Sequence, residues 1–276
     1  MNDRKGIFIT GGASGLGRAI AMRYAAAGWR VCIGDVNDER GADTAEDLAA
    51  GSPGALYLRC DVTREDDVQA VAATLQSRWG TIDVVVNNAG VALAGNIEDV
   101  AIADWQWILD INLMGVVRGC KVFTSVFKQQ GHGHFVNVAS MAGLLDVPTM
   151  SAYNVSKAGV VSLSETLQHE LCDDNIGVSV VCPSFFKTNL TESFRTTDPK
   201  LRKTMNKLLE KGRISAEEIA DYIFRAVEKK QFHVLPHADG RFLWMLKRYL
   251  PRSAYVWLFE HSTRHVRGRA EQAQET

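Results

Sequence analysis

The chain has 276 residues, of which 46% are apolar and 23% are charged, as is ordinary for a folded soluble protein. Its 31 basic and 32 acidic residues leave a net charge of −1, which argues against a nucleic-acid-binding protein with its usual basic excess. The same balance argues against a disordered chain. No stretch approaches the roughly 20 uncharged apolar residues that a membrane-spanning helix needs. The length suits one large α/β domain or two small ones.

Short apolar runs alternate with helical patterns along the chain. The runs occupy residues 6–10, 30–35, 55–59, 84–87, 134–137, 177–182 and 232–235, and helices are predicted over 16–27, 66–79, 104–130, 151–175 and 215–230. The runs are continuously apolar, which is typical of parallel strands covered on both faces. Together these elements predict an α/β fold in a single domain, a Rossmann-like doubly wound parallel sheet of about seven strands with helices on both faces.

The first run leads into a glycine-rich segment, residues 10–17, with the sequence TGGASGLG. Glycines between a strand and a helix let the backbone approach a pyrophosphate, and the helix N-terminus offers it N–H groups. The second run ends at Asp35, whose carboxylate can bind the adenosine ribose hydroxyls and would repel a 2′-phosphate. Arg40, the closest basic residue downstream, is compatible with a solvated helix residue. We therefore expect NAD rather than NADP. Asp61, after the third run, can either reach the adenine or cap the next helix.

Tyr153 and Lys157 stand four residues apart in a predicted helix and therefore share one face. A tyrosine with an unperturbed pKa of about 10 is a poor base at neutral pH. A neighbouring ammonium stabilises the phenolate and lowers that pKa, which makes proton exchange with an alcohol feasible. Ser140 follows the apolar run 134–139, at the sheet edge where ligands bind in such folds, and its hydroxyl can bind a substrate oxygen.

These motifs occur in one order with Asn87-Asn88-Ala89-Gly90, Asn112 and a Pro183…Thr188 segment. Over about residues 5–236 the chain resembles the classical short-chain dehydrogenases/reductases. The resemblance implies that Tyr153 is the general acid/base, that Lys157 lowers its pKa and holds the nicotinamide ribose, that Ser140 orients the substrate oxygen, and that Asn112 anchors a proton-relay water. The implied coenzyme contacts are Gly11, Ser14, Gly15 and Leu16 at the pyrophosphate, Asp35 at the ribose, Asp61 and Val62 at the adenine, Asn88, Ala89 and Gly90 at the adenosine side and central sheet, and Pro183 and Thr188 beside the nicotinamide. Asn87 is expected to brace the neighbouring strand. Ser184 departs from the family, in which glycine usually follows the proline, and is expected either to narrow the pocket or to bind the substrate.

By resemblance, residues 191–211 form a substrate lid, in which Leu201, Met205, Leu208 and Leu209 suit an amphipathic helix. Between Ser140 and Tyr153, further apolar surface comes from Leu144, Leu145, Val147 and Met150. The alternative is that these residues and the apolar lid residues pack on each other and contact no substrate. The sequence thus predicts an NAD(H)-dependent oxidoreductase that interconverts a secondary alcohol and a ketone on a lipophilic substrate, such as a steroid, a retinoid or a long-chain alcohol. A 3-oxoacyl-thioester reductase acting on carrier protein or coenzyme A is the nearest alternative. A non-catalytic NAD-binding protein or a membrane-surface protein is the alternative of another class.

The remaining signals concern compartment and metals. The cysteines (Cys32, Cys60, Cys120, Cys172 and Cys182) are odd in number and lack CxxC spacing, so we expect buried free thiols in a reducing compartment. The short polar N-terminus has no signal peptide, which favours a cytoplasmic location. No metal site is expected, because His132 and His134 have no third ligand nearby and suit a surface turn. Trp105 and Trp107 are expected in the core or at a subunit interface rather than stacked on a ligand.

The last 40 residues, 237–276, differ from the rest. They hold seven basic and four acidic residues, a net charge of +3, and six of the 23 aromatic residues. We expect the catalytic domain to span 1–236 and these residues to be an extension. If a helix in this extension continues through Pro251, one of its faces carries Arg241, Arg248 and Arg252. The segment 241–259 can cap the pocket, pack on a partner subunit or lie on an anionic membrane. By resemblance, the long helices 104–130 and 151–175 build a homodimer or homotetramer interface.

Overall fold

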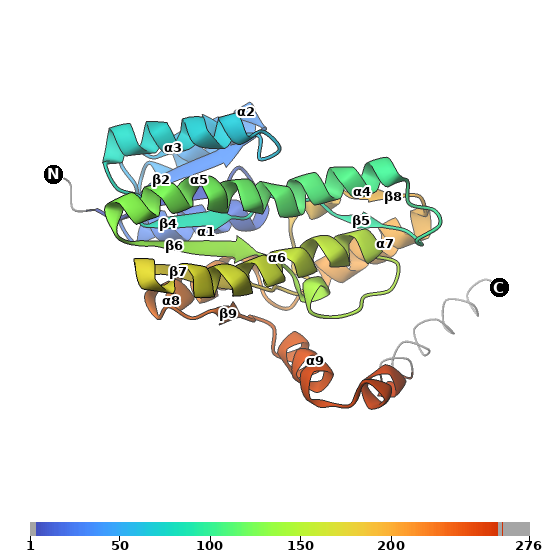
Figure 1. Cartoon of the computed structure of the whole chain (residues 1–276). Helices are drawn as coiled ribbons and strands as arrows, with labels where there is room; N and C mark the ends of the chain where they lie inside the picture. Colours follow the sequence, from blue (N-terminus) through green and yellow to red (C-terminus); the bar gives the residue numbers. More distant parts are fainter. Residues whose placement is uncertain (1–3, 259–260, 262–276) are drawn as a thin grey trace. The chain divides into compact units, whose positions relative to one another are not determined.

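The computed structural model describes residues 4–258 and 261 (Figure 1). Contacts within the chain divide it into two compact units, with the boundary between Pro236 and His237. Over the described residues, no helix is both long and apolar enough to cross a membrane.

The first unit is built on a seven-stranded sheet. Its strands are β1 (Gly6–Thr10), β2 (Arg30–Asp35), β3 (Leu56–Arg59), β4 (Val84–Asn87), β6 (Gly133–Val138), β7 (Ile176–Val181) and β9 (His233–Val234). They pair in the order β3-β2-β1-β4-β6-β7-β9, and every pair is parallel. The chain winds outward from β1 to β3 and returns to place β4 on the other side of β1. This reversal creates the crevice where ligands bind in doubly wound sheets, and the predicted fold class is confirmed.

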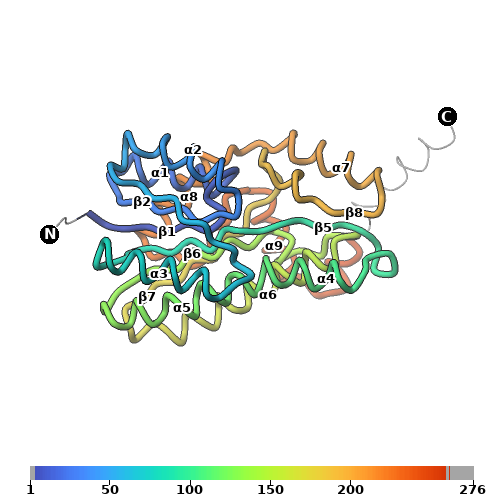
Figure 2. The backbone as a smooth tube through the Cα atoms, turned by 90° about the horizontal axis from the view of Figure 1, so that it is seen from above, coloured from blue at the N-terminus to red at the C-terminus, as the bar shows by residue number. Residues whose placement is uncertain are grey.

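Helices cover both faces of this sheet. On one face lie α1 (Gly15–Ala26), α2 (Asp38–Leu48) and α8 (Ala216–Glu228), and on the other α3 (Glu65–Trp79), α5 (Gly115–Gln130) and α6 (Ser151–Glu170), as Figure 2 shows from above. Because successive strand residues point to opposite faces, Ile7 and Ile9 of β1 enter the first core layer, while Phe8 packs with its ring centroid 5.5 Å from that of Phe123 in the second. All three side chains are fully buried.

Two predicted helices are interrupted. The helix expected over 104–130 is α4 (Ile102–Leu109) followed by a π-helical stretch, Asp110–Met114, and then α5. A π-turn inserts one extra residue without ending the helix, so the sequence still shows one continuous helical segment. The helix expected to reach residue 175 ends earlier, because α6 stops at Glu170 and a 3₁₀ turn follows.

The 3₁₀ turn after α6 also explains why the prediction that all five cysteines are buried is wrong at one position. All five cysteines are free, and four of them are buried as expected, but Cys172 is exposed. It lies in the 3₁₀ turn Cys172–Asp174 rather than within the long helix that the sequence predicted. Its side chain therefore faces away from the core.

A second, two-stranded sheet was not predicted. It pairs β5 (Leu93–Ala94) with β8 (Arg195–Thr196) in parallel. Strands of two residues are too short to produce a recognisable periodicity. After β8, the helix α7 (Pro199–Glu210) begins at the N-cap Asp198 and buries Met205 and Leu209.

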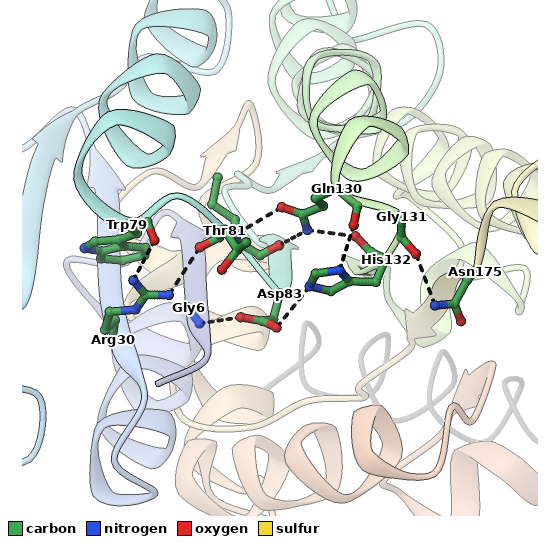
Figure 3. A network of polar contacts seen from close by, with 10 residues as sticks. Gly6, Arg30, Trp79, Thr81, Asp83, Gln130, Gly131, His132 and Asn175 are labelled. Atoms are coloured by element: carbon green, nitrogen blue, oxygen red, sulfur yellow. Dashed lines mark hydrogen bonds and ion pairs between the residues drawn. The ribbon is translucent and has the colours of Figure 1, made fainter. Parts of the chain in front are cut away.

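The amino-terminal edge of the large sheet is closed by polar contacts (Figure 3). Asp83 accepts a hydrogen bond from the Gly6 N–H at 2.7 Å and lies 3.4 Å from His132 Nε2. His134 is not in a surface turn, contrary to the sequence-based expectation. It is buried in β6 with Nε2 2.8 Å from Ser179 Oγ, because the strand begins at the preceding glycine. Burial lowers the pKa of His134 to about 4.

The second unit contains α9 (Ala238–Tyr249) and a further helical segment over residues 252–258. The helix does not continue through Pro251. Leu250 takes an extended conformation with φ −78° and ψ 147°, as the residue before a proline prefers. Arg252 therefore does not share a face with Arg241 and Arg248, which corrects the conditional expectation from the sequence.

Candidate active site

The turn between β1 and α1 is shaped to receive an anion. A Cβ on Gly17 would lie 2.1 Å from the carbonyl oxygen of Gly11, so only glycine permits this close approach. Ser14 is the N-cap residue of α1, yet its side chain makes no capping hydrogen bond. The N–H groups of the first helical turn thus remain available to a phosphate. Leu16 is buried beneath the turn, so it can offer a ligand its backbone and not its side chain.

The end of β4 holds this turn in place. Thr10 Oγ1 accepts hydrogen bonds from the N–H groups of Asn88 and Ala89 at 3.0 and 3.1 Å. The Asn88 side chain donates to the carbonyl oxygens of Thr10 and Gly11 at 2.9 and 3.1 Å. Asn88 therefore stabilises the glycine turn with its side chain. Asn87 bonds instead to Asn137 of the neighbouring strand at 2.8 Å.

Two carboxylates stand at neighbouring strand ends. Asp35 accepts hydrogen bonds from the N–H of Ala13 at Oδ2 and of Asn37 at Oδ1, both at 3.1 Å, which fixes its carboxylate beside the glycine turn. Asp61 Oδ1 accepts from the N–H and hydroxyl of Thr63 at 2.9 and 2.7 Å. The N-cap of α3 is Arg64, so Asp61 does not cap that helix. Val62, the next residue, is buried with 7% of its surface exposed.

Ser140, Tyr153 and Lys157 meet at the carboxyl ends of β6 and β7. Ser140 hydrogen-bonds to Tyr153, and its Oγ lies 3.4 Å from the carbonyl oxygen of Pro183. Lys157, one turn after Tyr153 in α6, places Nζ 6.0 Å from the centre of the tyrosine ring. That ammonium donates a hydrogen bond to the Val138 carbonyl at 2.9 Å. Three side chains from two separate segments are thus brought to one point.

Burial dominates the electrostatics of this group. It raises the pKa of Tyr153 above its usual value, and the hydrogen bond with Ser140 opposes that rise. Burial also lowers the pKa of Lys157 from 10.5 to about 8. In this structure the tyrosine is therefore held in its protonated form at neutral pH, and the lysine is close to losing its proton in mildly alkaline solution.

Asn112 lies in the π-helical stretch and is fully buried. Its Oδ1 accepts from the Val91 N–H at 2.8 Å, and its Nδ2 donates to the Val91 carbonyl at 2.9 Å and to Ser156 Oγ at 3.2 Å. A Cβ on Gly90 would lie 3.2 Å from Asn112 Oδ1 and 3.4 Å from Lys157 Nζ. The asparagine side chain therefore orders the backbone next to Lys157.

The loop after β7 completes the crevice. The Pro183 carbonyl accepts a hydrogen bond from the Met141 N–H at 2.9 Å, which ties this loop to the segment that carries Ser140. Ser184 is half-buried directly after it. Thr188 lies against the glycine turn, since its Oγ1 is 2.9 Å from the position of a Cβ on Gly15. All the residues expected to contact coenzyme from β1, β2, β3, β4 and β7 therefore lie at the carboxyl ends of their strands.

Three contributing residues were not singled out by the sequence. A Cβ on Gly143 would lie 2.6 Å from the backbone of Lys157, so this glycine lets the Ser140 turn pack on α6. Ser156 Oγ donates to the Tyr153 carbonyl at 2.8 Å and also accepts from Asn112. Cys182 is buried, and the charge of Lys157 acts on its thiol. Of these three, only Gly143 could have been noticed in the sequence, as a glycine three residues after Ser140 in the segment Ser-Met-Ala-Gly.

An apolar cluster surrounds Tyr153. It joins Tyr153 to Leu93, Ile108, Met150, Phe194, Met205 and Leu209, with Trp105 and Trp107 packed against it. Arg195 stacks over the Trp107 ring at 3.7 Å and pairs with Asp104 at 2.8 Å. The tryptophans thus pack within this unit. Leu201, Met205 and Leu209 of α7 belong to or pack on the cluster, whereas Leu208, which the sequence placed with them, is exposed.

Comparisons with known proteins agree with this geometry. Residues 5–199 match the family described as short chain dehydrogenase. The chain is 34% identical over 253 residues to the CLA biosynthesis dehydrogenase/reductase of Lactiplantibacillus plantarum, covering 85% of this chain and 88% of that protein. It is 34% identical over 241 residues to a 3-oxoacyl-[acyl-carrier-protein] reductase of Thermotoga maritima, covering 86% and 96%. Some curated relatives are longer, and the chain spans 43% of their length.

Among solved structures, a short chain dehydrogenase/reductase from Burkholderia phymatum in complex with NAD superimposes with a TM-score of 0.85 at 32% identity. The match covers 89% of this chain and 93% of that one.

Proposed function

Because the chain belongs to the short-chain dehydrogenase/reductase family, an oxidoreductase family that binds NAD(P), we propose that it is an NAD(H)-dependent enzyme interconverting a secondary alcohol and a ketone. The observation that carries this proposal is the hydrogen-bonded pair Ser140 and Tyr153, with Lys157 one turn away, at the same sheet edge as the glycine turn and Asp35.

The reaction assigned to this site moves one proton through the tyrosine. In ketone reduction, Tyr153 donates its proton to the substrate oxygen while Ser140 hydrogen-bonds to that oxygen. The raised pKa of Tyr153 keeps the required proton in place at neutral pH. In alcohol oxidation the tyrosine must first be deprotonated, and Lys157 stabilises the phenolate. When bound, the nicotinamide supplies or accepts the hydride.

Three features of the chain fit a dinucleotide. The N-terminus of α1 has no side-chain cap, Gly17 leaves room for the backbone of the turn, and Asp35 is held in place by two backbone N–H groups. A carboxylate at this position favours the ribose hydroxyls of NAD over the 2′-phosphate of NADP. These features support NAD as the coenzyme.

The apolar cluster around Tyr153 supports a lipophilic substrate, such as a steroid, a retinoid or a long-chain alcohol. An apolar substrate would replace contacts among the residues of this cluster with contacts of the same kind. A 3-oxoacyl-thioester reductase remains the nearest alternative, and the Thermotoga maritima relative carries that name.

The decisive experiment compares Tyr153→Phe with the wild type in a screen of lipophilic alcohols and hydroxyacyl thioesters, monitored by NADH formation and repeated with NADP. We expect Tyr153→Phe to lose turnover and to keep NADH binding, measured by fluorescence titration. The control is Tyr222→Phe on the exposed surface of α8, which should leave both unchanged. Retained turnover in Tyr153→Phe contradicts the mechanism, and an inactive wild type that still binds NADH favours a non-catalytic NAD-binding protein.

We also propose a homo-oligomer, either a dimer or a tetramer, formed through α5 and α6. Met114, just before α5, and Val155 in α6 expose 42% and 49% of their surface, although both are large apolar residues. Covering them with the same helices of a second copy would remove apolar surface from water. Light scattering after size-exclusion chromatography tests this proposal, and a monomer at micromolar concentration contradicts it.

The second unit supports a proposal of peripheral membrane contact through residues 241–259, of which 259 lies outside the described residues. Phe242, Met245 and Tyr249 of α9, spaced as neighbours on one helical face, are 61%, 48% and 76% exposed. Residues 237–258 carry four basic residues and one acidic residue, so an anionic lipid surface complements them while a second copy would repel them.

Co-sedimentation of the full chain with vesicles tests this contact. Binding should be stronger to phosphatidylcholine mixed with phosphatidylglycerol than to phosphatidylcholine alone. The triple variant Phe242→Ser, Met245→Ser, Tyr249→Ser should lose it, whereas Tyr222→Ser in α8 should not. Equal sedimentation of the triple variant and the wild type contradicts the proposal. Either result is compatible with a cytoplasmic location, which the five free cysteines support.

A further inference from the structure

We propose that Glu192 is a second determinant of coenzyme choice, because it holds Arg40 away from the position that a 2′-phosphate would take beside Asp35. The inference rests on the proposed function, since it assumes that Asp35 faces the adenosine ribose. Glu192 acts through Arg40 and is therefore a positioning residue.

An ion pair across the crevice carries the inference. Arg40 lies in the first turn of α2, where its N–H bonds to the N-cap Asn37 at 3.0 Å, five residues after Asp35. Its Nη1 donates to Glu192 Oε2 at 2.6 Å, although the two residues are 152 positions apart in the sequence. The other oxygen of Glu192 accepts from Asn189 Nδ2 at 2.6 Å. One oxygen of the Glu192 carboxylate thus binds Asn189, and the other binds Arg40.

Glu192 reaches this position because the loop after β7 lies against the glycine turn. Thr188, four residues earlier, is the residue whose hydroxyl approaches Gly15. The segment that carries Glu192 therefore forms the opposite wall of the crevice from α2. A residue on that wall can hold the guanidinium of an α2 arginine in an ion pair.

The charges around Arg40 oppose a phosphate. Glu192, Asp35 and Glu39 all raise the pKa of the Arg40 guanidinium, with Glu192 contributing most. One arginine thus faces three carboxylates, and a phosphate arriving there would meet a net negative field. The ion pair is about half exposed, with side chains 46% and 49% accessible, so we assign it a directing role and not a large stabilising one.

The other arginine at this edge is also engaged. Arg59 Nη1 donates to Asp38 Oδ2 at 2.8 Å and to the Val36 carbonyl at 3.0 Å. Arginine is the side chain that usually accommodates the 2′-phosphate of NADP. Freeing Arg40 from Glu192 would offer a guanidinium to that phosphate without changing a residue of α2.

Equilibrium binding of NADH and NADPH, followed by coenzyme fluorescence, tests this without any substrate. Glu192→Gln should improve the affinity for NADPH relative to NADH by about fivefold over the wild type. The double variant Glu192→Gln, Arg40→Gln should lose that gain, because the freed arginine is its source. Glu210→Gln, at the exposed end of α7, is the matched control and should leave the ratio within about twofold. The gain should shrink as salt is added.

An unchanged ratio in Glu192→Gln overturns the inference, as does a gain that persists in the double variant. The second outcome would assign the effect to lost negative charge alone. A wild-type protein that binds neither coenzyme, or prefers NADPH, overturns both this inference and the proposed coenzyme. If the wild type prefers NADH and Glu192→Gln leaves the ratio of NADPH to NADH affinity unchanged, the proposed function stands and only this inference is overturned.

Discussion

Replacing Lys157 with methionine should make the protein more stable at neutral pH while abolishing turnover. Lys157 is 4% exposed, and burial lowers its pKa from 10.5 to about 8. That change corresponds to a burial cost of about 3 kcal/mol for the charged form. Methionine fills a similar volume without the charge, but it loses the hydrogen bond to the Val138 carbonyl, which costs about 1 kcal/mol. The expected net gain is about 2 kcal/mol.

The gain should depend on pH in a defined direction. Below pH 8, Lys157 is protonated in both the folded and the unfolded state, so the burial cost is fully present. Between about pH 8 and 10.5 the unfolded chain binds more protons at this site than the folded one, so the stability of the wild type rises with pH. Lys157→Met lacks this dependence. The difference between the two proteins should therefore shrink toward zero near pH 9.5.

Urea unfolding followed by circular dichroism at fixed protomer concentration measures both quantities. Lys203→Met, at an exposed position of α7, is the control and should change stability by less than about 0.5 kcal/mol. If Lys157→Met is destabilised at pH 7, or if its difference from the wild type does not change with pH, the assigned burial cost is refuted.

Three further outcomes are expected. Gly143→Ala should destabilise the protein by about 1–3 kcal/mol and reduce turnover, because its Cβ would lie 2.6 Å from the backbone of Lys157; an unchanged melting temperature and rate would contradict this packing. His134 is held neutral by burial with a pKa of about 4, so urea midpoints should fall from pH 6.5 to 4.5 in the wild type and fall less in His134→Gln. Ellman's reagent should titrate one thiol in the native protein and five after unfolding, and Cys172→Ser should reduce the native count to zero; a second reactive native thiol would show that a buried cysteine is accessible.

Local patterns predicted the frame of the molecule well. The runs at 6–10, 30–35 and 84–87 coincide with β1, β2 and β4. At α8, Ser215 and Glu218, three residues apart, form a capping box. These features depend on apolar continuity and on hydrogen bonds between residues close in sequence, so a single sequence contains them. The interruption of the helix 104–130 by a π-turn has no such local signal.

The site was predictable in its components and less so in its contacts. Ser140, which follows β6, comes together with Tyr153 and Lys157, which share one face of α6. The direction of the tyrosine pKa was harder to predict, because it depends on how deeply the ring is buried. Asn88 was expected to touch coenzyme, and its side chain bonds to the glycine turn, a contact between residues 77 positions apart.

The sequence by itself determined the sheet, the glycine turn and the chemical groups at the strand ends, because these follow from periodicity and from spacing along one element. Only the tertiary structure decided what surrounds each group. Lys157 faces a backbone carbonyl in a buried site, Met205 and Leu209 of α7 join the apolar cluster around Tyr153, and Arg40 turns toward Glu192. Burial and long-range pairing set the charge state and direction of a side chain, and both arise only when distant segments pack together.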